Sequence, residues 1–135
     1  QAGRTRKAEV DAVSFATANE DIYDAIDISG VVVSPDIRNR ETQLPAVLFG
    51  LEDSGATNST STSGGPFHSR YVFACMHSSR LNADALAADV LTDLRASSDF
   101  VSVHEASRSA EIFQRGADTV PVYVTEITTT ITFAS

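Results

Sequence analysis

The chain has 135 residues, of which 42% are hydrophobic and 21% charged, so one globular domain with an ordinary apolar core is expected. Its net charge of −8 argues against a protein that binds nucleic acid by broad neutralisation of phosphates. No apolar run approaches the roughly 20 residues that a membrane-spanning helix needs. The single cysteine, Cys75, excludes an intrachain disulfide scaffold.

The N-terminal segment, residues 1–7, is expected to be a flexible arm. It holds three of the ten basic residues of the chain, Arg4, Arg6 and Lys7. No apolar stretch follows them, so the segment does not have the form of a secretory signal. A basic arm is able to contact an acidic partner or nucleic acid, and a solvated terminus is the alternative.

The pattern after the arm predicts two helices with a break between them. Residues 8–18 place apolar side chains at helical spacing. Thr17 to Glu20 then has the form of a capping box, which predicts a break near Asn19 and a second short helix over residues 21–26.

A short strand and a long hairpin are expected next. Residues 31–33 form a β-branched run that predicts a strand, and the polar residues after it predict a loop. The strand predicted over 44–51 is apolar on both faces, which indicates cover from two sides. Residues 54–65 are almost purely Ser, Thr, Gly and Asn, so they predict a flexible loop leading to a strand over 66–77.

The following stretch predicts an amphipathic helix that ends near Arg95. Leu86, Val90 and Leu94 form its apolar row at i, i+4 and i+8. The candidate N-caps are Ser78, Ser79 and Asn82.

The last part of the chain predicts a pair of strands. Residues 100–105 form one strand, which is expected to continue over 107–114 after a bulge or bend. A turn at 115–118 follows. The strand over 122–133 alternates regularly, which predicts one buried face and one solvated face.

Together these elements predict an α+β fold with a single domain over residues 1–135. Its core is a mainly antiparallel β-sheet with the helices packed on one face and a long β-hairpin. The expected order is helix, short strand, strand, strand, helix, strand, strand.

No pattern in the chain indicates an enzyme, a metal site or a cofactor. His68, His77 and His104 are the only histidines, and they lack further ligands at metal-binding spacing. Cys75 lies in an aromatic, strand-forming run and is interpreted as a core residue. No dinucleotide fingerprint or nucleophile elbow is present. A row of carboxylates is interpreted as a solvated helix face: Asp21, Asp24 and Asp27.

Five stretches in chain order carry a resemblance to a known family: EDIYDAIDISGVVVSP, LPAVLFGLED, RYVFACMHSS, NADALAADVLTDLRAS and AEIFQRGADTVPVYVTEITTTITF. Their order and composition resemble the small tail-completion, or tail-terminator, proteins of tailed bacteriophages. The resemblance spans residues 8–133, with Ala46 where the family often has an aromatic residue.

This resemblance implies a structural protein of the virion that has no catalytic residues and no cofactor. Such proteins form a ring, typically a hexamer, at the head-proximal end of the tail tube. The ring stops tube polymerisation and joins the tube to the head-completion or connector protein. DNA passes through its lumen without specific binding. The expected partners are therefore other copies of the chain, the tail-tube protein and the connector, after assembly in the host cytoplasm.

The loop at 54–65 and the N-terminal arm are the expected subunit contacts. The residues expected at the interface are Arg4, Arg6, Lys7, Asp53, Asn58, Ser61, Gly64 and Arg70. A surface loop with no role in assembly is the alternative for 54–65.

Two other functions stay open at this point. One is another head–tail component, such as a head-closure or tail-tube protein. The other, from a different class, is a small-ligand-binding or enzymatic α+β domain, for which the scattered polar residues are His68, His77, Arg70 and Glu105.

Overall fold

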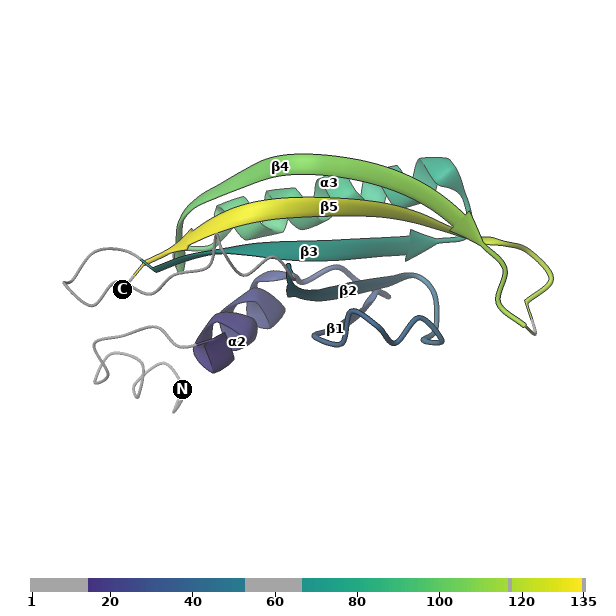
Figure 1. Cartoon of the computed structure of the whole chain (residues 1–135), viewed down its shortest axis with the longest axis horizontal. Coiled ribbons are helices and arrows are strands. Elements are labelled where there is room, and N and C mark those ends of the chain that lie inside the picture. The colour runs from purple at the N-terminus through teal and green to yellow at the C-terminus, as the bar shows by residue number, and fades with distance from the viewer. Residues whose placement is uncertain (1–14, 53–66, 117, 135) are drawn as a thin grey trace.

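The computed structural model describes residues 15–52, 67–116 and 118–134, which form an α+β fold of two helices and one five-stranded sheet (Figure 1). The elements are α2 (Phe15–Ala25), β1 (Val32–Ser34), β2 (Ala46–Leu51), β3 (Phe67–His77), α3 (Arg80–Ala96), β4 (Phe100–Phe113) and β5 (Val122–Phe133). This order is the one predicted from the sequence.

The strand order in the sheet is β1-β2-β3-β5-β4, so β5 lies between β3 and β4. β1 pairs with β2 in parallel, and every other pair is antiparallel. The predicted fold class, a mainly antiparallel sheet with a β2–β3 hairpin, is therefore confirmed. In Figure 1, α3 lies behind the sheet and β4 forms its upper edge.

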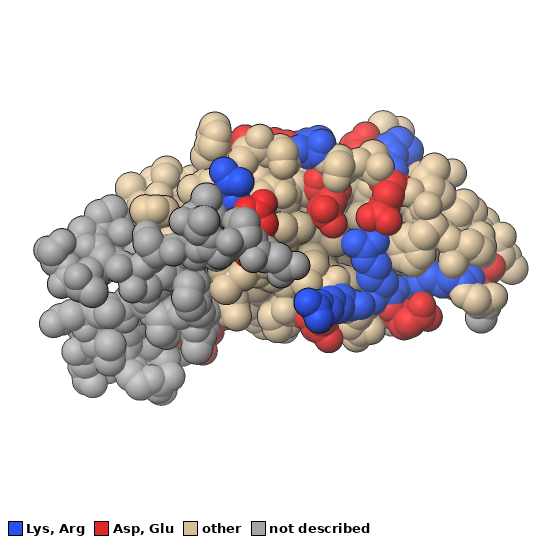
Figure 2. Space-filling view, in the orientation of Figure 1, with Lys and Arg blue, Asp and Glu red and all other residues tan. Residues whose placement is uncertain are grey.

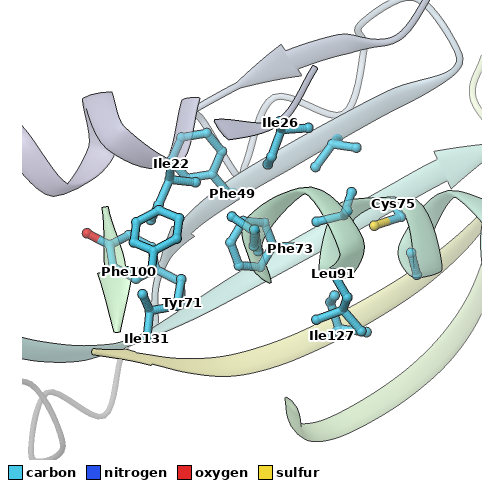
Figure 3. Packing of buried hydrophobic residues seen from close by; sticks show 14 of the residues in the cluster. Ile22, Ile26, Phe49, Tyr71, Phe73, Cys75, Leu91, Phe100, Ile127 and Ile131 are labelled. Atoms are coloured by element: carbon cyan, nitrogen blue, oxygen red, sulfur yellow. The ribbon is translucent and has the colours of Figure 1, made fainter. Parts of the chain in front are cut away.

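The main hydrophobic core lies between the sheet and the two helices (Figure 3). Odd-numbered residues of β2, β3 and β5 share this face, because side chains alternate along a strand. Phe49 and Phe73 stack with their ring centroids 5.8 Å apart. The helices bury Ile22 from α2 and the predicted row from α3 against these rings. That row is Leu86, Val90 and Leu94.

A second, smaller core covers one end of the opposite sheet face. Its buried residues are Ala46, Leu48, Ala74, Met76, Val122 and Val124. Ile37 and Leu44 of the β1–β2 connection pack against it. The connection approaches closely at Gly50, where an added Cβ would lie 3.1 Å from the Ile37 side chain. The prediction of a solvated even-numbered face over 122–133 is therefore wrong at Val122 and Val124, because a distant loop covers them.

The predicted break near Asn19 is wrong, because α2 runs through this residue without interruption. Ala18 and Ile22 of α2 and Ile26 directly after it repeat every four residues and are all buried, which a continuous helix explains. The capping-box pattern also fits the interior of a helix and is not used as a cap here. Residues 8–14 of the predicted first helix lie outside the described residues.

The prediction that Asp21, Asp24 and Asp27 form one solvated helix face is wrong in part. Asp21 is fully buried, whereas Asp24 and Asp27 are exposed. Asp27 follows the end of α2, and its backbone N–H donates to the Asp93 carboxylate of α3 at 2.9 Å. These carboxylates therefore do not share one solvated helix face.

The boundaries of α3 and β4 agree closely with those predicted from the sequence. Ser79 is the N-cap of α3, and its hydroxyl accepts a hydrogen bond from the Asn82 N–H at 3.2 Å. β4 is one continuous strand with a register shift between Glu105 and Ser107, where a bulge was expected.

Tyr71 carries a buried hydroxyl that has no hydrogen-bond partner among the described residues. Burial raises the pKa of this phenol above its usual range. The Tyr71→Phe variant should be as stable as the parent or more stable by up to about 2 kcal/mol, because it removes an unpaired buried polar group. The free energy of unfolding from denaturant titration measures this, with Tyr23→Phe at an exposed position as control. A loss of stability in Tyr71→Phe would show that the hydroxyl has a partner.

Cys75 is fully buried in the main core, and burial raises the pKa of its thiol to about 12. The thiolate is the reactive form, so the native protein at pH 8 should not react with a thiol reagent on the timescale of free cysteine. Reaction should follow unfolding and should accelerate in denaturant in step with the unfolded population. Rapid labelling without denaturant would contradict the buried position.

Candidate assembly surface

The edge strand β4 is exposed to solvent along most of its length. It has fourteen residues and pairs with β5 from end to end. Only Phe100 is buried, and the segment from 106 to 112 is exposed on both faces. No strand in the described part of the chain pairs with its outer side. An edge of this kind presents backbone N–H and C=O groups on which another strand is able to pair.

Two large apolar side chains lie near the two ends of this edge. Val101 is 68% exposed and Ile112 is 58% exposed. Water-exposed valine and isoleucine on an edge strand favour contact with another apolar surface.

The register with β5 assigns the β4 side chains to the two faces of the sheet. Val101 and Ala106 are bulged residues, since neither has a partner in β5. The residues on the α3 side are Phe100, Val103, Glu105, Arg108, Ala110 and Ile112. The residues on the opposite side are Ser102, His104, Ser107, Ser109, Glu111 and Phe113.

The bulge at Ala106 explains the ion pair at the middle of β4. Residues three apart on a regular strand point to opposite faces, but the extra residue places Glu105 and Arg108 on the same face. The guanidinium of Arg108 donates to both carboxylate oxygens of Glu105, at 2.7 and 3.1 Å. These hydrogen bonds lower the pKa of Glu105 and raise the pKa of Arg108.

Arg80, at the start of α3, binds the backbone near the C-terminal end of β4. Its guanidinium donates to the carbonyl oxygens of Glu111 at 2.9 Å and Val124 at 3.0 Å, and to the Thr125 hydroxyl at 2.8 Å. Thr125 in turn donates to the Asp84 carboxylate at 2.5 Å. One side chain therefore fixes α3, β4 and β5 relative to each other.

A second arginine fixes the β4–β5 turn to the β1–β2 connection. The Arg115 guanidinium contacts Asp118 at 2.6 Å and donates to the carbonyl oxygens of Arg40 and Thr42. Arg40 lies over the Phe113 ring and pairs with two glutamates of the sheet. In the view of Figure 2, basic and acidic side chains accordingly lie close together and do not form separate patches.

The opposite edge of the sheet, formed by β1, differs from the β4 edge in length and lining. β1 has three residues, and Val32 on it is 36% exposed. Beside it lies a hollow of about 300 Å³. Apolar side chains and two carboxylates line it: Tyr23, Asp24, Ile26, Asp27, Ile28, Val31 and Val33. This edge is short, hollowed and acidic, whereas the β4 edge is long and extended.

Of the residues predicted at the interface, the structure places Arg70. It lies on β3 and pairs with Glu52 at 3.5 Å, beside a shallow hollow of about 700 Å³ that Glu52 lines. Asp53, which was also predicted at the interface, lies outside the described residues. The other predicted interface residues also lie there: Arg4, Arg6, Lys7, Asn58, Ser61 and Gly64.

The histidines do not come together. His68 and His77 have partners of opposite parity in β5 and so point to opposite faces of β3, as expected from their spacing. In the described ranges, no three His, Cys, Asp or Glu side chains gather in a way that could hold a metal ion. The exposed edge at β4 was not among the features predicted from the sequence, although the Ser, Ala and charged residues at 104–111 are typical of an exposed strand.

Neither a scan against protein-family models nor a search of curated proteins finds a match to this chain. Among the helices of the described residues, neither α2 nor α3 has the length and apolar character needed to cross a membrane.

The Arg80 contacts predict a specific loss of stability. The Arg80→Met variant keeps most of the apolar stem but removes the donor to two carbonyl oxygens and the Thr125 hydroxyl, and it removes the ion pair with Asp84. It should lower the free energy of unfolding by about 1–3 kcal/mol, since hydrogen bonds to charged groups contribute at this scale. Arg38→Met, which alters an exposed arginine, should change it by less than about 0.5 kcal/mol. Equal stability of the two variants would show that the Arg80 contacts do not stabilise the fold.

Proposed function

We propose that this chain is a virion structural protein of a tailed bacteriophage, a tail terminator. It acts as a ring, typically a hexamer, at the head-proximal end of the tail tube. There it stops tube polymerisation and binds the head-completion or connector protein, and DNA passes through the lumen. The element order of the fold, which is the order expected from the resemblance, supports this proposal.

The observation that carries the proposal is the presence of two unlike open edges on one sheet. A ring whose subunits all face the same way joins two different surfaces of the same chain at every interface. The β4 edge offers an extended strand with exposed Val101 and Ile112. The β1 edge offers a hollow lined by apolar side chains and carboxylates. These are two surfaces of the kind that a head-to-tail ring requires.

The charge of the chain suits a channel for DNA better than a binding surface for it. The net charge is −8, and an acidic wall repels phosphate, so that DNA slides without adhering. The interleaved ion pairs on the sheet face suit contacts with other proteins, because they offer both signs of charge within a short distance.

Electron microscopy of particles made with and without the protein tests this function. Particles that contain it should show a ring between the tail tube and the head, labelled by an antibody against this chain. Particles assembled without it should have tails of uncontrolled length that are not joined to heads. Normal tail length and joining in its absence, or a position elsewhere in the particle, would refute the proposal.

A further inference from the structure

We infer that β4 is the docking strand for a second copy of this chain. Two β4 strands would pair antiparallel about a two-fold axis between Ala106 and Ser107 and continue the sheet across both subunits. The inference rests on the side chains and bulges of β4, so it stands whether or not the chain acts in a phage tail.

The sequence of β4 is complementary to itself about this axis. Residues at equal distances on the two sides meet across an antiparallel pair. Glu105 then faces Arg108 of the second copy, and the reverse pair forms at the same time. Val103 faces Ala110, and the two exposed apolar residues, Val101 and Ile112, meet near the ends. Opposite charges and apolar pairs directly across two strands stabilise their association.

The bulge at Ala106 makes this pairing geometrically possible. Residues that meet directly across an antiparallel pair lie on the same face of the sheet. On a regular strand, Glu105 and Arg108 would lie on opposite faces, and an axis midway between them would bring the wrong faces together. The bulge restores the match, because both lie on the α3 side here. The flanking pairs agree: Ser102 with Glu111, Val103 with Ala110, and His104 with Ser109 each share a face.

The fold also leaves room for the second copy. α3 lies mainly over β3 and β5 and contacts β4 through Phe100 and through the Arg80 and Arg95 guanidinium groups, while β4 forms the outer boundary of the sheet. Paired strands lie about 4.8 Å apart, so the two adjacent β4 strands would separate the two α3 helices on their common face.

A two-fold pair and a one-way ring use β4 in different ways. A two-fold interface joins the same surface on both copies and closes at two subunits, whereas a ring needs unlike surfaces. The same edge cannot serve both at once. The β4 pair is therefore a form of the free protein in which the edge is covered, and a ring that uses this edge forms only after the pair opens.

Charge reversal separates contacts between copies from the ion pair within one copy. The Glu105→Arg variant carries two positive charges at positions 105 and 108, and the Arg108→Glu variant carries two negative charges. Each variant alone should dimerise more weakly than the parent by about tenfold or more, because two attractive cross-strand pairs become repulsive. An equimolar mixture of the two should regain a heterodimer, since each arginine then faces a glutamate of the other chain.

Sedimentation equilibrium gives the dissociation constants, and native mass spectrometry with one chain isotopically labelled identifies the heterodimer. The pair within each chain stays repulsive in the mixture, so recovery of dimer reports the contact between copies alone. Glu20→Arg, the same charge change on the exposed surface of α2, is the matched control and should dimerise like the parent. Circular dichroism confirms that each variant is folded.

Three results would overturn the inference: a parent protein that stays monomeric at its highest soluble concentration, oligomers unaffected by either reversal, or a mixture that regains no heterodimer. Any of these would leave the ring proposal open, because that proposal is tested by the position of the protein in particles. Conversely, absence from particles would leave a measured β4 dimer intact.

Discussion

The position of β5 between β3 and β4 is the constraint on which the rest of the structure depends. β5 pairs with β3 on one side and with β4 on the other, along nearly its whole length. Its odd-numbered side chains contribute to the main core and Val122 and Val124 to the second core. Because β5 takes the place beside β3, β4 is left at the edge. The exposed strand is thus a consequence of the strand order.

Contacts within the single chain keep β4 extended in the absence of a partner. Phe100 anchors one end of β4 in the main core, where its ring meets Phe133 edge-on at 5.3 Å. Arg80 binds the other end through the carbonyl oxygen of Glu111. Between these anchors the strand is mostly exposed and pairs with β5 at every residue except the bulged Val101 and Ala106. A strand that is already ordered loses little conformational entropy on association, which favours its use as a docking surface.

Local patterns in the sequence predicted most helices and strands. Features that depend on packing between distant parts of the chain were not predicted. The two apolar faces predicted for β2 and the i, i+4 row predicted for α3 were sufficient because each pattern lies within one element. The solvated face predicted for 122–133 was wrong at Val122 and Val124, because Ile37 and Leu44, far away in the chain, pack against them. The break at Asn19 was wrong because a short capping pattern was given more weight than the longer repeat of Ala18, Ile22 and Ile26.

The strand order, and with it the exposed edge, has no signature in local periodicity. Most of the predicted interface residues lie outside the described residues, so that prediction stays a prediction.

The strand order also determines how the chain must fold. β3 cannot complete its pairing until β5 arrives, and both α3 and β4 lie between them in the sequence. The register joins Phe67 to Phe133, a very long separation for a chain of this size. Pairings of this kind form slowly, because the loss of loop entropy precedes the gain from contacts. During that interval the apolar β3 edge, with Tyr71, Phe73 and Cys75, is open to other chains. Slow refolding that competes with aggregation at high concentration is the expected consequence of placing β5 between β3 and β4.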